Sequence, residues 1–182
     1  MLLPALAATP QRDPTLDLQP ESRLWVSGTS TVRAFQCQAG AFDAKIESTG
    51  ADAVAAVLAG EKAVSTIEVT VPAEKLDCRN GTMNEHMRKA LKADVNPQIT
   101  WTLTSYEVQG ANVVINGKLT IAGKENSIEL RGTGSAENGT IRFKGSKQFR
   151  MTEYGVKPPS LMLGTMKVGD PITVSFDLVL SE

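Results

Sequence analysis

The amino-acid sequence predicts an all-β domain, an eight-stranded antiparallel barrel with one or two short helices. The chain has 182 residues, of which 41% are hydrophobic, and this is enough for one domain with its own core. About eight segments alternate apolar and polar residues, and turn-forming residues separate them. A flat sandwich would satisfy the same alternation. The lack of conspicuous edge-protecting strands favours a closed barrel.

Residues 1–21 are expected to precede the folded domain, which we place at residues 22–182. Prolines interrupt any helix in this stretch, and residues 9–21 are typical of an extended linker. Ala5-Leu6-Ala7 has the small-residue pattern of a signal-peptidase site, but the basic region and most of the apolar region of a signal peptide are missing. We interpret residues 1–21 as a residual signal peptide and flexible linker; a coincidence of small residues is the alternative.

The strand predictions rest on β-branched and aromatic residues in period-two alternation. Residues 63–71 alternate most cleanly, with Ile67, Val69 and Val71 on one face. Asn138-Gly139 predicts a hairpin turn, whereas Asn116-Gly117 would leave two very short arms and is interpreted as a bend within one strand. The eight predicted strands are 23–35, 40–48, 63–71, 98–108, 112–123, 126–134, 139–151 and 171–180.

Two short helices are predicted between the strands. Residues 52–60 are rich in alanine, with Asp52 as a candidate first cap and Gly60 as a candidate stop. Residues 82–92 form the better helix, because Thr82 and Glu85 have the spacing of a capping box. Its apolar stripe consists of Met83, Met87 and Leu91.

Charge and composition argue against several classes of partner. The formal net charge is −1, with both signs mixed along the chain, so no electrostatic footprint for nucleic acid or an anionic membrane is predicted. Aromatic residues make up 5% of the chain, too few for base-stacking platforms. No stretch approaches the apolar length of a membrane span, so stable membrane insertion is not expected.

Catalytic and metal-binding patterns are equally sparse. His86 is the one histidine and falls in the middle of the predicted helix, where a lone imidazole rarely has a catalytic role. The sequence contains no GxSxG elbow, no cluster with metal-ligand spacing and no pair of carboxylates whose spacing on one element would set up acid and base roles. We therefore predict a protein that is not an enzyme, with no catalytic residues and no metal site.

The two cysteines, Cys37 and Cys78, belong to different predicted elements. A disulfide between them would close a loop whose entropy is worth about 4 kcal/mol. Two buried reduced thiols are the alternative. We predict the disulfide, because pairing is the default in an exported chain.

The inward-facing side chains of the predicted strands either fill a solid core or line a cavity. Residues 151–170 are stiffened by Pro158 and Pro159 and are also apolar, which a plain surface loop would avoid. Such a segment can cover a barrel mouth, so we expect Leu161 and Met162 in a flap and Tyr154 at the rim. The predicted ligand-binding residues are Ile67, Val69, Trp101, Leu103, Ile115, Ile141, Phe143, Tyr154, Leu161, Met162 and Phe176.

Several segments resemble the YceI-like family. NEHMRKALKADVNPQITW, GKLTIAGKENSIEL and MTEYGVKPPSLMLGTMKVGDPITVSFDL resemble its successive signatures in the expected order, and WVSGTSTVRAFQC is similar to its first strand. The resemblance covers roughly residues 22–180. It implies a lipocalin-like barrel, exported to the periplasm or secreted, that encloses a long isoprenoid chain such as a polyprenyl or quinone tail.

The resemblance also sets the expected function. We predict a protein that binds and carries or stores this lipid, with no required cofactor beyond a bound isoprenoid lipid or quinone. An enzyme acting on an isoprenoid lipid and a packed barrel used as a protein-interaction module are the alternatives. The expected partner is the lipid, nucleic acid is not expected, and a homodimer is left open.

Overall fold

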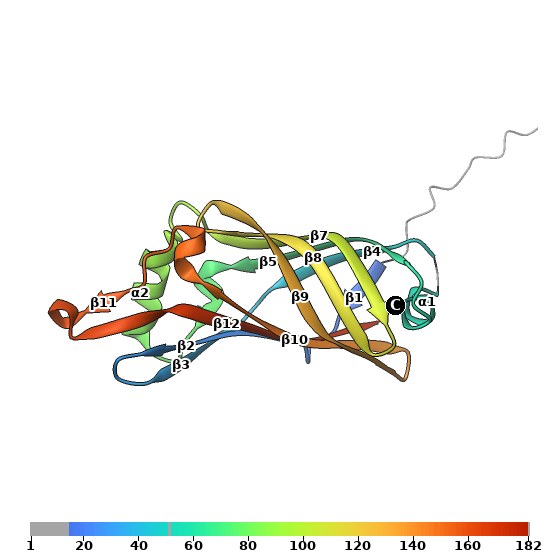
Figure 1. The fold of residues 1–182 in the computed structure, drawn as a ribbon, viewed down its shortest axis with the longest axis horizontal. Helices are drawn as coiled ribbons and strands as arrows, with labels where there is room; N and C mark the ends of the chain where they lie inside the picture. Colours follow the sequence, from blue (N-terminus) through green and yellow to red (C-terminus); the bar gives the residue numbers. More distant parts are fainter. Residues whose placement is uncertain (1–14, 51, 182) are drawn as a thin grey trace, which may run out of the picture.

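The computed structural model describes residues 15–50 and 52–181, and this part of the chain is dominated by long antiparallel strands (Figure 1). The α-helices are α1 (Ala53–Leu58) and α2 (Gly81–Leu91), and the 3₁₀ helices are η1 (Ala73–Lys75), η2 (Met151–Tyr154) and η3 (Met162–Gly164). The strands are β1 (Thr15–Leu18), β2 (Arg23–Ser30), β3 (Ala34–Ala39), β4 (Asp43–Ser48), β5 (Val64–Pro72), β6 (Leu76–Asp77), β7 (Gln98–Gln109), β8 (Asn112–Ile121), β9 (Lys124–Glu137), β10 (Thr140–Arg150), β11 (Ser160–Leu161) and β12 (Met166–Ser181).

Eight of these strands form a closed ring, in the order β1-β4-β5-β7-β8-β9-β10-β12, and the pair Asp17↔Ser181 joins β12 back to β1. The prediction of an eight-stranded antiparallel barrel is confirmed, but the predicted strand 23–35 is two strands, β2 and β3, that lie outside the ring. The strand β12 has 16 residues. One of its edges pairs with β10, and the other pairs with β1 at one end and with β2 along the rest. Beyond β2 the sheet continues through β3 to β6, so the barrel is extended at one end.

The strand β1 corrects the predicted domain boundary. Thr15–Leu18 lies within residues 1–21, yet it pairs with both β4 and β12. Leu16 is only 2% exposed and belongs to a buried apolar cluster. The linker prediction is therefore wrong for these four residues, because their apolar-polar alternation fits the gap between two strand edges. The predicted signal-peptide residues before position 15 lie outside the described residues.

The helices α1 and α2 lie at opposite ends of the barrel (Figure 1). At the end with α1, the residues Ala53 and Val54 pack in one buried cluster with Ile46 and Ile141. At the other end, Met87 and Leu91 of α2 pack against the cluster that contains Val71 and Leu76.

The cap of α2 differs from the predicted one. Asn80 is the N-cap residue of α2, and its Oδ1 accepts a hydrogen bond of 3.0 Å from the backbone N–H of Met83. Thr82 is the second residue of the helix and so lies past the cap position, where asparagine is preferred over threonine. The helix ends at Lys92, whose φ of 52° is left-handed.

The predicted turn at Asn138-Gly139 is confirmed, and Asn116-Gly117 lies within one strand, as predicted, and is not a turn. Asn138 and Gly139 join β9 to β10 with φ values of 52° and 77°, as a tight hairpin requires. Gly117 lies in the middle of the continuous strand β8. Opposite Gly117, the register of β7 shifts between Leu103 and Ser105, so the irregularity lies in the partner strand.

The segment 151–170 is a projecting hairpin and not a plain loop. It starts with η2, passes through Pro158 and Pro159 without a strand, and then forms β11, which pairs with the start of β12. The strand β12 therefore begins at Met166, five residues before the predicted start at Pro171. The hairpin extends beyond the barrel at the end that carries α2 (Figure 1).

Candidate functional site: an apolar cavity in the barrel

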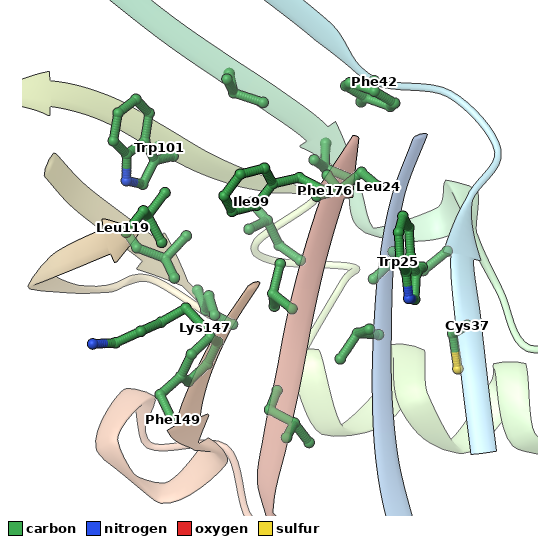
Figure 2. Close-up of a pocket in the computed structure, with 18 of the residues that line it drawn as sticks. Leu24, Trp25, Cys37, Phe42, Ile99, Trp101, Leu119, Lys147, Phe149 and Phe176 are labelled. Atoms are coloured by element: carbon green, nitrogen blue, oxygen red, sulfur yellow. The ribbon is translucent and has the colours of Figure 1, made fainter. Parts of the chain in front are cut away.

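The inner faces of the strands enclose a cavity of about 770 Å³. Alternation along each strand sends every second side chain inward, and the inward positions are overwhelmingly aliphatic or aromatic. The helix α2 adds a stripe of lining residues at one end, namely Met83, Met87, Ala90 and Leu91. Leu24, Ile99 and Phe176 come from different strands and meet the same space (Figure 2). The interior is therefore a lined cavity, not a solid core.

Most of the predicted site residues lie around this cavity. The side chains of Leu161 and Met162 lie outside the described part of the structure, so the predicted flap contacts stay a prediction. Leu103 is not part of the lining. The predicted residues that do line the cavity are Ile67, Val69, Trp101, Ile115, Ile141, Phe143, Tyr154 and Phe176.

The bulge in β7 explains the position of Leu103. Ile99 and Trp101 face inward, and simple alternation would place Leu103 on the same face. The register shift after Leu103 changes the phase of the strand, and Tyr106 and Val108 occupy the next lining positions. A bulge depends on the pairing with the partner strand, so the β7 sequence alone does not predict it.

The predicted position of Tyr154 at the rim is wrong, because this residue is buried in the wall of the cavity. It is 2% exposed and packs edge-on against Phe149, with ring centroids 5.2 Å apart and an interplanar angle of 64°. Burial raises the pKa of the Tyr154 phenol to about 12, and the neighbouring Glu153 carboxylate is the smaller cause. The 3₁₀ helix η2 folds this side chain inward instead of leaving it on an exposed loop.

Glycines on the inner face let aromatic rings lie flat against the wall. A methyl group on Gly145 would lie 2.5 Å from Cζ of Phe176, and one on Gly28 would lie 2.6 Å from Cζ of Phe35. The same holds for Gly132 with Phe143 and for Gly117 with Trp101. Because each ring occupies the space of a missing side chain, it takes less volume from the cavity. The rings of Phe143 and Phe176 also stack, with centroids 4.9 Å apart.

Polar groups on the wall are few. Of the described lining residues, only Arg33 and Lys147 carry a permanent charge. The stem of Lys147 faces the cavity, and its amine extends away from Ile99 and Phe176 (Figure 2), as expected of a cation that stays hydrated. Trp101 Nε1 is buried without a hydrogen-bond partner, the one such side-chain atom among the described residues. Sequence reasoning missed Lys147, although it has the inward phase of Ile141 and Phe143.

The cavity reaches the surface at the end that carries α2. Four of the five exposed lining residues are there, namely Val32, Arg33, Asn80 and Thr82. We call this opening the mouth. The predicted disulfide between Cys37 and Cys78 is confirmed, and it ties β3 to the residues just before α2. Both cysteines also line the cavity, so the bridge holds the helix over the barrel end.

The site offers binding surface and little reactive chemistry. His86 lines the cavity, but no second imidazole exists to pair with it. Within the described ranges, no group of three His, Cys, Asp or Glu side chains could hold a metal ion. No helix in the same ranges has the length and apolar character to cross a membrane. What the arrangement can do is remove an apolar guest from water.

A closed antiparallel barrel with an apolar interior defines a lipocalin-like fold. The family model described as a YceI-like domain matches residues 22–180, and the chain belongs to this family. A comparison with curated proteins finds no match.

Solved structures share the fold at low sequence identity. BcnA of Burkholderia cenocepacia has a TM-score of 0.74 and 20% identity, over 90% of this chain and 99% of that one. The Campylobacter jejuni YceI protein has a TM-score of 0.62 and 18% identity, over 78% and 81%. A polyisoprenoid binding domain from Saccharophagus degradans, implicated in plant cell wall breakdown, has a TM-score of 0.64 and 12% identity, over 92% and 97%.

Proposed function

We propose that this protein binds a long-chain isoprenoid lipid, a polyprenyl or quinone tail, in the barrel cavity and carries or stores it. The observation that supports this most directly is the continuous apolar lining, which runs from Ile141 beside the α1 end to Val32 at the mouth. An isoprenoid tail presents only methyl, methylene and alkene surface, so it needs such a wall and almost no polar partners. The Saccharophagus degradans domain, described as polyisoprenoid binding, has the same fold.

The size of the cavity sets the length of tail that it can hold. A volume of about 770 Å³ accommodates roughly 25 heavy atoms at about 30 Å³ each. At about 0.3 kcal/mol per heavy atom, such a guest gains about 7.5 kcal/mol, which corresponds to a Kd of a few micromolar. The flexible side chains of Met83 and Met87 at the α2 end allow the cavity to adapt to a longer tail.

A binding role is favoured over catalysis. A lipid-modifying enzyme needs a positioned acid, base or nucleophile, and His86 is the lining residue closest to that description. We expect His86→Gln to retain extracted lipid within about twofold of the wild type, because the imidazole has no partner in a catalytic arrangement. Loss of all bound lipid in a folded His86→Gln protein would contradict this.

The proposed location is the periplasm or the exterior of the cell. The bridge between Cys37 and Cys78 supports an oxidising compartment, where such bonds persist. Export through an N-terminal signal peptide remains part of this proposal.

Solvent extraction of the purified protein, followed by mass spectrometry, tests the function. The expected result is an isoprenoid lipid at about one molecule per chain, and its reloading after delipidation. If a straight-chain lipid is extracted instead, the protein binds lipid but the proposed isoprenoid class is wrong. An interior that is empty and takes up no apolar probe would overturn the proposal in favour of a protein-interaction role.

A further inference from the structure

Two hairpins project next to each other beyond the mouth of the cavity, and we call their ends the tip surface. It consists of Val32 and Arg33 between β2 and β3, of Leu163 between β11 and β12, and of Lys167 at the start of β12. Val32 is 64% exposed and Leu163 is fully exposed. The two side chains leave apolar surface in water at the ends of adjoining hairpins, which makes this end of the molecule a candidate contact site.

Hydrogen bonds through Thr31 hold the two hairpins together. The Thr31 N–H donates to the carbonyl oxygen of Lys167 at 3.0 Å, and the Thr31 hydroxyl donates to the carbonyl oxygen of Thr165 at 3.1 Å. The Lys167 N–H in turn donates to the Thr31 hydroxyl oxygen at 3.1 Å. The two apolar residues therefore belong to one joined surface.

The charge of the tip surface differs from that of the whole chain. Residues 29–34 and 157–168 contain Arg33, Lys157 and Lys167 and no aspartate or glutamate. All three cations are exposed. The first turn of α2, at the same end of the barrel, carries no acidic residue. The formal net charge of −1 hides this local excess of positive charge.

We propose that the tip surface docks the protein on an anionic lipid bilayer, with the mouth of the cavity toward the membrane. Exposed apolar side chains flanked by lysine and arginine suit a bilayer interface, where the apolar groups enter the headgroup region and the cations meet lipid phosphates. Val32 and Arg33 also line the mouth, so a tail leaving the membrane would enter the cavity with little exposure to water. Docking does not depend on which lipid the cavity holds.

The exposed residue Val95 supplies a contrast within the same chain. It is 73% exposed, in the connection between α2 and β7, but its neighbour is the exposed Asp94. An acidic neighbour repels an anionic bilayer, so Val95 should contribute nothing to docking. Lys62, an exposed cation next to Glu61 near the α1 end, is the matching control for charge.

Vesicle sedimentation of the full chain tests the proposal, with phosphatidylcholine vesicles with and without phosphatidylglycerol. We expect binding to the anionic vesicles that weakens with added salt. Arg33→Gln with Lys167→Gln should lower the partition coefficient about 25-fold, at roughly fivefold per cation. Leu163→Ser should lower it about tenfold. Val95→Ser and Lys62→Gln should leave it unchanged.

A second readout follows docking by fluorescence, as a change against the emission of the native Trp25 and Trp101. A tryptophan introduced by Leu163→Trp should shift its emission to the blue on anionic vesicles, and one introduced by Val95→Trp should not. Wild-type protein that stays in solution with anionic vesicles would overturn the proposal, as would equal losses in the tip and control variants. Extraction of lipid without vesicles is measured separately, so an empty cavity would refute the proposed function and leave docking intact.

Discussion

A tryptophan in place of Val69 should fill part of the cavity without unfolding the barrel. Val69 lines the cavity from β5, is only half-buried, and lies between Ala44 of β4 and Trp101 of β7 in the sheet. Its side chain packs against the cluster of Ala39, Val71 and Leu76 and also faces the open volume of the cavity. A larger side chain there displaces guest atoms instead of protein atoms.

The size of the effect follows from the difference between the two side chains. Tryptophan has about seven more heavy atoms than valine, so Val69→Trp should exclude roughly seven heavy atoms of guest. At about 0.3 kcal/mol each, the loss of binding is about 2 kcal/mol, or roughly 30-fold in Kd. We expect the Tm to change by no more than about 3 °C.

Two matched variants separate a cavity from a solid interior. Ile141 is 7% exposed and packs with Leu16 and Ile46 at the α1 end, so Ile141→Trp should overpack this cluster at a cost of about 1–3 kcal/mol. At about 2–4 °C per kcal/mol, its Tm should fall by roughly 2–12 °C. Glu68→Trp places the same ring on the exposed face of β5 and should change neither stability nor binding.

The assay combines thermal unfolding, followed by circular dichroism, with titration of geranylgeraniol against a fluorescent apolar probe. A cavity is excluded if Val69→Trp lowers the Tm as much as Ile141→Trp and the wild type takes up no probe. The interior would then be close-packed, and the carrier function would have no site.

Three further predictions follow from single contacts. Replacing Cys37 and Cys78 with serine should cost about 4 kcal/mol for a sequence separation of 41, or roughly 8–16 °C in Tm, and the unfolded, non-reduced wild type should show no free thiol by titration. Phenolate absorbance should show the Tyr154 side chain ionising near pH 12. Because folding raises this pKa from 10.0, the contribution of the neutral phenol to folding stability is complete below pH 10 and is lost as the pH rises toward 12. In Tyr154→Phe this loss of stability at high pH should disappear. A methyl group at Gly117 would collide with the Trp101 ring, so Gly117→Ala should cost about 1–3 kcal/mol in a urea titration and shift the indole emission.

The sequence was sufficient to predict the barrel and most of the wall, because alternation along a strand is a local property. Ile67, Val69 and Ile115 each lie on an inward phase that their own neighbours define. Lys147 lies on the inward phase of β10, but a charged side chain is not expected to line an apolar interior. A strict reading of phase, applied to every residue type, would have included it.

Features that depend on a second strand could not be predicted in the same way. The bulge that removes Leu103 from the lining is a mismatch between β7 and β8. The strand β1 has only four residues and is stable because β4 and β12 leave a gap that it fills. The burial of Tyr154 depends on η2, a single turn that turns the ring toward Phe149. The bulge and the strand β1 are decided by neighbouring strands, whereas the burial of Tyr154 is decided by a turn that contains it.

Whether the barrel is hollow is also decided by pairs of residues on different strands. Alternation specifies which side chains face inward, but a hollow and a solid barrel share the same pattern. The volume that remains depends on where the large rings lie, and Phe176 lies flat because Gly145, on the neighbouring strand β10, has no side chain. Phe143 lies over Gly132 of β9 for the same reason. A methyl group at either glycine would displace the ring above it and take room from the guest, so the cavity depends on these small residues as much as on the apolar ones.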